Sequence, residues 1–485
     1  MLEFTILILL PLLSAAVCRL AGNMRAQHLV SLAAAVAHLS ISFLMFIDAH
    51  QTTLPFLFST DALSKLFLLI LSNVYFWIVL VSRSFLLGSA GGQKGFGKKY
   101  YFALLNFYLF ANTAAILSNH FGMYWVAAEA TTLSVAPLVY YYRTEEALEA
   151  MWKYLFLVSV GIAFAFIGIL FLALSANGSP LEGGQLFFTD FVRGASKLSP
   201  VWLKASFIFI FVGLSTKIGI APMHSGDIDA TSNAPSPVAA LMSGSLRITA
   251  LLGLLRIIQI IRPTDAWSFA REILVIGGLL SVFVAFLFMF KVKNYKRMLA
   301  YSSVEHLGII TLGIGTGGLA FAGAMYHCVY NSITKVVLFL AAGNIHRRFL
   351  SREVDRVGGV LGVMPWTGWI CLFAFLAISA LPPFGIFFSE LMIFEGMLFS
   401  DKPWVLAVLL VVLLFIFINM GNTLFRMLYR PVESGELSAG SGERFGIVHF
   451  ASIALLAMMI LVALARPDAL HDNIAAVCRD FGVQL

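Results

Sequence analysis

Apolar stretches recur along almost the whole chain, from Leu2 to Ala465, and only short polar connections separate them. A helix needs roughly 20 mostly apolar residues to cross the hydrocarbon core of a bilayer, and by that criterion we count about fourteen spans. Of all residues, 60% are hydrophobic and only 12% are charged, whereas an ordinary soluble domain carries roughly 25% charged residues. The sequence therefore predicts an all-α, polytopic membrane protein.

The formal net charge of +7 would raise the question of nucleic-acid binding in a soluble protein. Here the basic residues gather in alternate loops, roughly two to one in favour of the odd-numbered loops, so their distribution indicates topology. Lys291, Lys293, Lys296 and Arg297 form one such group. The positive-inside rule then places the odd-numbered loops in the cytoplasm and both termini outside. We expect a multi-pass protein of a bacterial or archaeal cell (inner) membrane that contacts lipid and binds no nucleic acid.

The four cysteines, Cys18, Cys328, Cys371 and Cys478, are isolated from one another and form no C-x-x-C pair. Their spacing does not provide the ligands of an iron–sulfur cluster or of a nickel or zinc site, and we interpret them as small apolar residues that fill space between helices. We therefore expect no cofactor in this chain. Redox chemistry, where there is any, belongs to a partner chain.

Two of the expected spans are interrupted by proline. One break lies at residues 220–222 and runs into a polar stretch up to Pro235, and the other lies at residues 381–385. They fall in about the seventh and twelfth spans, and interrupted helices at corresponding positions of two halves are typical of inverted-repeat transporters. Broken helices at membrane depth need protein or water to satisfy their backbone, so an ion path would pass there. Kinks that serve packing alone are the alternative.

The spacing of the two breaks divides the chain into two five-helix repeats with flanking helices. We expect N-terminal helices 1–3 in residues 1–98, a first inverted repeat of helices 4–8 in 99–262, a second of helices 9–13 in 263–430, and the last helix and tail in 431–485.

Charged and histidine side chains lie inside several expected spans. A charged group at the bilayer centre costs roughly 2.5–3.5 kcal/mol, so each one needs a partner, water or a function. Lys, Glu and His can all be brought to titrate near neutral pH by burial opposed by a nearby charge, and a row of them can pass a proton along. The proton-path candidates are Glu129, Lys217, His224, His306, His327, Lys335 and Glu390, with Lys153, Arg247 and Glu305 as a second group.

Structural ion pairs and snorkelling end residues are the alternative interpretation of these charges. For Lys153, Arg247, Glu395 and Arg426 this structural interpretation is at least as strong as the functional one, because several of these residues lie near span ends. By contrast, Lys335 follows His327 and Asn331 at i, i+4, i+8 spacing, which places all three on one helix face.

Several of these segments resemble the antiporter-like subunits shared by respiratory complex I, multisubunit sodium/proton antiporters and group 4 membrane-bound hydrogenases. The similarity runs over nearly the whole chain and is greatest to hydrogenase-4 component F. The motifs that carry it are WVAAEATTL at 125–133, ALEAMWKY at 147–154, YSSVEHLG at 301–308 and LFLAAGN at 338–344, and LPPFGIFFSE at 381–390 supports the wider superfamily.

This resemblance implies a fold of fourteen helices in two inverted five-helix repeats, within a complex whose peripheral subunits hold iron–sulfur and, in hydrogenases, nickel–iron centres. It also implies roles for individual residues. Glu129 and Lys217 match a pair of residues in which each modulates the proton affinity of the other. His327 and Lys335 match central relay positions, and Glu390 matches the ionisable group facing the outer half-channel.

The chain also departs from the family pattern. After Pro222 the family usually continues with histidine, one residue and W-L-P-D-A-H, of which this chain keeps His224 and the D-A pair at 229–230. Ile248 stands where many relatives carry a lysine, and Arg247, one position earlier, is turned by about 100°. The second histidine of the eleventh helix is replaced by Asn331.

Three functions are compatible with these features. The first is a proton-translocating, non-redox membrane subunit driven by electron transfer in its partner subunits. The second is a scaffold subunit that conducts no ions, and the third is a stand-alone Na⁺/H⁺ antiporter. The residue types suit protons and sodium ions alike, and a hydrogenase, a formate hydrogenlyase or a quinone reductase are all compatible hosts. Buried charge favours the first.

Overall fold

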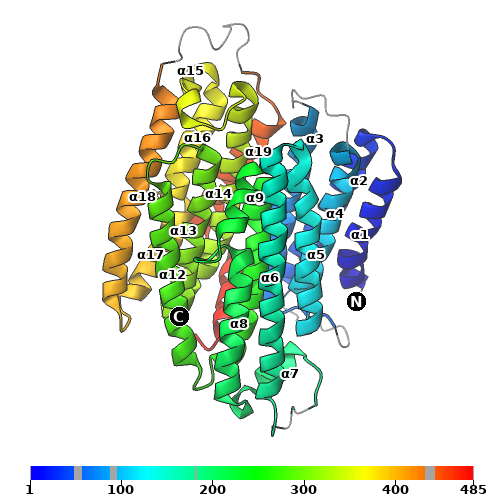
Figure 1. The fold of residues 1–485 in the computed structure, drawn as a ribbon, viewed down its shortest axis with the longest axis vertical. Coiled ribbons are helices and arrows are strands. Elements are labelled where there is room, and N and C mark those ends of the chain that lie inside the picture. Colours follow the sequence, from blue (N-terminus) through cyan, green and yellow to red (C-terminus); the bar gives the residue numbers. More distant parts are fainter. Residues whose placement is uncertain are drawn as a thin grey trace.

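The computed structural model describes residues 2–48, 57–87, 96–179, 181, 183–431 and 443–483, and helices make up most of these ranges. The helices that make up the spans run side by side in one bundle (Figure 1). In chain order they are α1 (Leu2–Leu20), α2 (Met24–Ile47), α3 (Ala62–Leu87), α4 (Phe96–Leu117), α5 (Phe121–Val139), α6 (Glu145–Ser175), α8 (Pro200–Ile218), α9 (Ser225–Asn233), α10 (Ser236–Leu241), α11 (Arg247–Ile261), α12 (Trp267–Met289), α13 (Tyr295–Thr316), α14 (Gly318–Phe349), α16 (Pro365–Ile378), α17 (Gly385–Leu398), α18 (Pro403–Tyr429) and α19 (Ile447–Ala465).

Eleven helices in the described ranges are long and apolar enough to cross a membrane, counting α10–α11 as one. Two more, α5 and α13, have the length of a span, and α16 with α17 makes another. The structure thus agrees with the prediction of about fourteen spans. The shorter elements are α7 (Phe188–Arg193), α15 (Val360–Val363) and α20 (Asp468–Asp480).

Both predicted breaks are present. The helix α8 ends at Ile218, Gly219 adopts a left-handed φ of 90°, and α9 begins six residues further on at Ser225. The helix α16 ends at Ile378, and α17 begins at Gly385 after two consecutive prolines. Each break leaves backbone groups unpaired by its own helix, so it needs protein or water beside it at membrane depth. Neighbouring helices bury His224 in the first break and Phe384 in the second, whereas the prolines Pro222, Pro382 and Pro383 are exposed.

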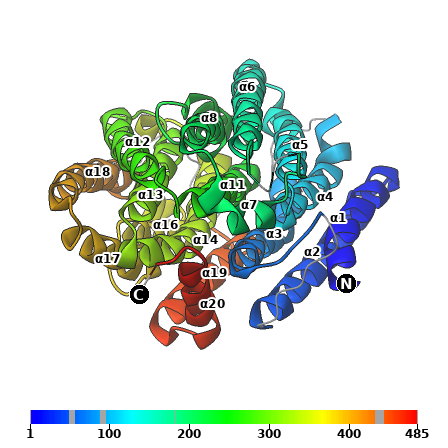
Figure 2. The ribbon, with the colours of Figure 1, turned by 90° about the horizontal axis from the view of Figure 1, so that it is seen from below.

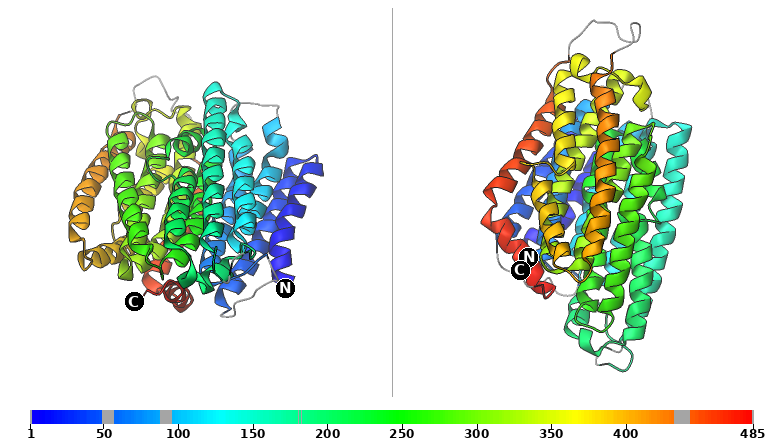
Figure 3. Two further views of the ribbon diagram at one scale, coloured as in Figure 1. Left: turned by 60° about the horizontal axis from the view of Figure 1, so that its bottom comes forward. Right: turned by 90° about the vertical axis from the view of Figure 1, so that its left-hand side faces the viewer.

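The centre of the bundle is formed by α10–α11 and α14, which are almost entirely buried, whereas α1, α6 and α18 keep apolar faces on the outside. Seen from below, α11 and α14 lie in the interior, with α1 and α2 at one edge and α18 at the other (Figure 2). The two ends of the chain lie at the same end of the bundle, where α20 packs across it (Figure 3). Polar side chains on α11 and α14 are therefore remote from lipid.

Candidate functional site

In the first half of the bundle, Lys217 of α8 reaches α5 at the turn that carries Glu129. Lys217 lies in the last turn of α8, just before the break, and is 2% exposed. Its Nζ donates to the carbonyl of Ala128 and, at 2.8 Å, to Oγ1 of Thr132. Glu129 Oε1 accepts a 2.6 Å hydrogen bond from Ser159 of α6. Lys217 Nζ is thus held by two neutral oxygens, within electrostatic reach of the Glu129 carboxylate.

A second charged pair lies where α9 packs near the start of α11. Arg247 and Asp227 form an ion pair, and both side chains are fully buried. Nη2 of Arg247 also donates to Oγ1 of Thr231 at 3.2 Å, while its Nε and Nη1 have no hydrogen-bond partner among the described residues. A π-helical turn at Met242–Leu246 directly precedes Arg247. Such turns are frequent at functional sites.

In the second half, Lys335 has surroundings similar to those of Lys217, although it does not lie at a break. It is fully buried in the middle of α14, and its Nζ donates to Oγ of Ser302 on α13. Glu305 lies one turn further along α13 and is also buried. This lysine, too, is held by a neutral oxygen near a buried glutamate.

Beyond Glu305, the buried polar groups continue as a hydrogen-bonded row. His306 Nδ1 lies 3.0 Å from Nε2 of His327, and Nδ1 of His327 lies 3.0 Å from Oγ of Ser389. Glu390 Oε1 is 3.7 Å from Nδ1 of His306. Three helices, α13, α14 and α17, supply these side chains, and the break before α17 brings its first turns against both histidines.

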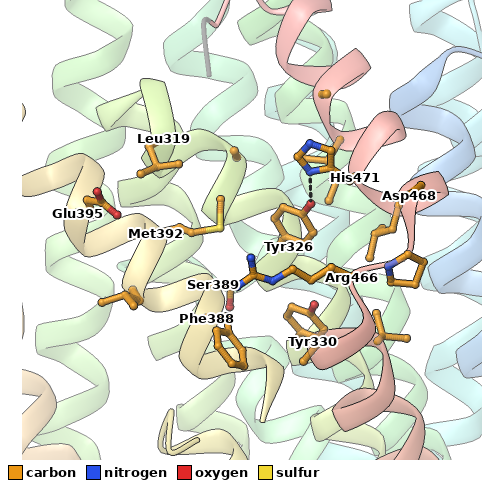
Figure 4. Close-up of a pocket in the computed structure, with 18 residues that line it drawn as sticks. Leu319, Tyr326, Tyr330, Phe388, Ser389, Met392, Glu395, Arg466, Asp468 and His471 are labelled. Carbon is orange, nitrogen blue, oxygen red and sulfur yellow. Dashed lines mark hydrogen bonds between the residues drawn. The ribbon is translucent and has the colours of Figure 1, made fainter. Parts of the chain in front are cut away.

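Two cavities adjoin this row. A small one of about 50 Å³ lies between Glu305, His306, Glu390 and the middle of α18, and a water molecule needs about 10–15 Å³. A larger one of about 540 Å³ lies between α14, α17 and the junction of α19 with α20. Ser389 lines its wall, and Arg466 reaches across it (Figure 4). The two cavities thus approach the row of hydrogen bonds from two sides.

Two of the predicted residues stand apart from these clusters. Lys153 is half exposed and pairs with Glu149 at 2.5 Å and with Asp229 at 3.6 Å, which fits the structural interpretation. His224 lies in the first break against the rings of Tyr301 and Phe288, and its Nδ1 has no partner in the described part of the chain.

The substitutions that separate this chain from its family are also visible. Ile248 is buried in α11 as an ordinary apolar residue, while the neighbouring Arg247 turns toward Asp227. Asn331 lies between His327 and Lys335 on α14, is 1% exposed, and its Oδ1 accepts no hydrogen bond from a described residue.

Several polar residues of this region escaped the sequence analysis. Lys296, counted there as a loop residue, is 1% exposed in the first turn of α13 and donates to the carbonyl of Ala234 at 2.5 Å. Asp227 could have been noticed as an acidic residue in a broken span. Nothing in the sequence distinguishes Ser302 or Ser389 from other serines, because their role depends on which helices face them.

A bundle of membrane spans, two of them broken and each half holding a buried lysine near a glutamate within the bundle, defines an antiporter-like membrane subunit. Residues 118–417 match the family described as NADH:quinone oxidoreductase/Mrp antiporter, TM. The chain is also 34% identical over 358 residues to a hydrogenase-4 component F homolog of Methylacidiphilum infernorum, which covers 73% of this chain and 75% of that protein. The chain belongs to the NADH:quinone oxidoreductase/Mrp antiporter family.

Solved structures show the same fold at lower identity. A chain of the membrane-bound sulfane sulfur reductase, an archaeal respiratory membrane complex, superposes with a TM-score of 0.86 at 20% identity, over 99% of this chain and 98% of that one. A chain of the Mrp complex from Dietzia sp. gives 0.86 at 17% identity, with the same coverage.

Proposed function

We propose that this chain translocates protons as the antiporter-like membrane subunit of a multisubunit oxidoreductase complex, driven by electron transfer in partner subunits. The observation that carries this proposal is the repeated arrangement of a buried lysine, held by neutral oxygens near a glutamate: Lys217 near the partly buried Glu129, and Lys335 near the buried Glu305. A charge that gains no full ion pair is expensive to keep in a bilayer. A lysine in such a position is accounted for when it alternates between its charged and its neutral state.

The hydrogen-bonded row in the second half supplies the exit of this path. Lys335 donates to Ser302 of α13, and Glu305 lies one turn beyond Ser302 on that helix. Glu305 in turn shares the small cavity with His306 and Glu390. From His306 the row continues through His327 to Ser389 at the wall of the larger cavity. Hydrogen-bonded side chains and water-sized cavities are what proton transfer needs.

The two halves correspond to inverted repeats of residues 99–262 and 263–430. In support, α6 packs along α8 in the first and α14 packs along α17 in the second, so the helix before each broken span covers it. Interrupted helices at matching positions of two repeats are typical of transporters.

The partners of this chain are other membrane and peripheral subunits, with iron–sulfur and, for a hydrogenase, nickel–iron centres in those subunits. The similarity of the chain to a hydrogenase-4 component F homolog supports this assignment. For orientation, the end that carries both termini faces the outside of a bacterial or archaeal cell membrane, as the arginine- and lysine-rich loops at the other end favour. We therefore expect a phosphatase fused to the C-terminus to be active in whole cells.

Proton movement in membrane vesicles that carry the whole complex tests this function. We expect Lys217→Ala to abolish acidification, measured by quenching of a pH-sensitive dye, while the amount of assembled complex stays unchanged. The matched control is Lys204→Ala, which changes a partly exposed lysine at the start of the same helix. Equal acidification by Lys217→Ala and the native complex would instead identify a scaffold subunit.

A further inference from the structure

We propose that His306, His327 and Glu390 form a binding site for a transition-metal dication of the zinc type. The site goes beyond the proposed function, because binding a metal ion does not require that the chain moves protons. Each residue comes from a different helix, α13, α14 and α17, and all three side chains are buried.

The distances between the ligand atoms are those of a metal site. His306 Nδ1 and His327 Nε2 are 3.0 Å apart, and His306 Nδ1 and Glu390 Oε1 are 3.7 Å apart. All three atoms lie within 4.8 Å of one another. Around a tetrahedral zinc ion with bonds of about 2.0–2.1 Å, neighbouring ligand atoms are about 3.4 Å apart. Small side-chain shifts are therefore enough to place all three on one ion.

The set of donors also suits zinc. Two imidazole nitrogens and one carboxylate are a common zinc set with an open fourth position. The cavity of about 50 Å³ beside His306 and Glu390 has room for a water molecule there. Ser389 holds Nδ1 of His327 at 3.0 Å, which aims Nε2 at the other two ligands. Such partners of a ligating histidine fix its ring and its tautomer.

Charge balance explains how a dication is tolerated at this depth. Glu390 and Glu305 line the same small cavity, so two carboxylates offset two positive charges. Lys335 is a buried cation on the same helix as His327; its Nζ donates to Oγ of Ser302, and both histidines lie within its electrostatic reach. Without a metal ion, the two histidines satisfy each other through their hydrogen bond, which is the purely structural interpretation of the same contacts.

The larger cavity provides the route of entry. Its wall includes Ser389, which is hydrogen-bonded to His327, and the acidic residues Glu395 and Asp468. Arg466 extends from the α19–α20 junction toward Ser389 (Figure 4). A cation entering here passes this guanidinium, so Arg466→Gln is expected to speed metal uptake without changing the amount bound.

Zinc binding to the purified full-length chain in lipid nanodiscs tests the site, with Zn²⁺ as the probe and bound metal measured after dialysis. We expect one equivalent of Zn²⁺, which His327→Gln and Glu390→Gln remove. Ser389→Ala is expected to lower the affinity by roughly 10–100-fold, as for other partners of ligating histidines. The matched control is His38→Gln, which changes a buried histidine hydrogen-bonded to Ser72 and Thr113 and is expected to retain the metal.

X-ray absorption at the zinc edge of the unmodified protein needs no variant and settles the ligand set if a variant fails to fold. Two imidazoles and a carboxylate around zinc support the site. Absence of bound Zn²⁺, Zn²⁺ retained by both ligand variants, or a spectrum without imidazoles overturns it. A chain that moves protons but binds no Zn²⁺ overturns this inference alone, and one that binds Zn²⁺ without moving protons overturns the proposed function alone.

Discussion

At the scale of single residues, the pair of Arg247 and Asp227 is a fully buried ion pair inside the bundle. Arginine stays charged at any depth, and here its guanidinium has one carboxylate, one hydroxyl and no other hydrogen-bond acceptor among the described residues. Asp227→Asn would leave this charge buried without a counter-charge. We expect a loss of about 3–5 kcal/mol of folding stability, measured as earlier thermal unfolding in detergent.

The double variant Asp227→Leu/Arg247→Met is the control for this prediction. Replacing a buried ion pair by apolar residues of similar size is often neutral for stability. We therefore expect the double variant to unfold near the native temperature. A single Asp227→Asn variant as stable as the native chain would contradict an uncompensated charge at this position.

Glu443 provides a prediction for the dependence of stability on pH. It lies just before α19, outside the spans, and accepts hydrogen bonds from His449 Nε2 at 2.9 Å and from the backbone N–H of Thr367 at 3.1 Å. Burial raises the pKa of Glu443, but these hydrogen bonds outweigh burial and leave its pKa below the ordinary value. Because the unfolded chain has the higher pKa, the carboxylate stabilises the fold at neutral pH.

That contribution is present above the unfolded pKa of about 4.3 and is lost as pH falls through the lower folded pKa. We expect the native chain to lose thermal stability as it is acidified below that value, and Glu443→Gln to lose less over the same range. Melting curves recorded at stepwise lower pH measure the difference. Parallel pH profiles for the two proteins would show that this carboxylate is not linked to folding.

Sequence reasoning located several of the buried charges, though not Lys296 or Asp227, and hydropathy could not tell which of them lie together. Hydropathy is enough to show that Lys217, Lys335 and Glu390 lie deep in spans, since a charge stands out from an apolar stretch. The partners Ser159 and Ser302 could not be predicted, because serine is common on any helix face and its role depends on packing between distant segments.

At the scale of helices, the contact between α6 and α8 positions Lys217. A Cβ added at Gly213 would lie 2.5 Å from the backbone N of Ala165 and from the carbonyl O of Gly161. Backbone atoms inside a helix cannot move aside. Gly213→Ala therefore forces the two helices apart, one turn before Lys217.

We expect Gly213→Ala to lower stability by about 1–3 kcal/mol, as overpacking in a dense core does, and to reduce proton movement with it. Thermal unfolding and vesicle acidification measure the two effects. The control is Gly362→Ala in α15, where nothing lies within 4 Å of an added Cβ. If the two glycine variants behaved alike, the close contact would have no energetic importance.

Proline made the two broken spans predictable, since a proline inside an apolar stretch removes a helical hydrogen bond. Other elements were not predicted. The π-helical turn before Arg247 leaves no mark in the sequence, because it depends on how neighbouring helices take up one extra residue. The helix α20 was missed because it is short and amphipathic, below the length of a span.

At the scale of the whole molecule, the polar groups of the two halves approach each other through the centre. Tyr154 lies within electrostatic reach of Glu129, Asp227 and Arg247, and Arg247 lies within reach of Lys335. The buried charges thus form a sequence across the bundle, from α5 to α17. We therefore expect one connected path rather than two separate ones.

A connected path predicts how substitutions combine. If Lys217 and Lys335 act in series, each single change to alanine interrupts the whole path, so Lys217→Ala and Lys335→Ala each remove nearly all acidification and the double variant is no worse than either. Groups that act as a unit are non-additive in this way. If the halves conducted separately, each single variant would keep the share of the other half, and only the double variant would be inactive. Initial rates of dye quenching, normalised to the assembled complex, distinguish the two cases, because strict non-additivity requires that every proton pass both lysines.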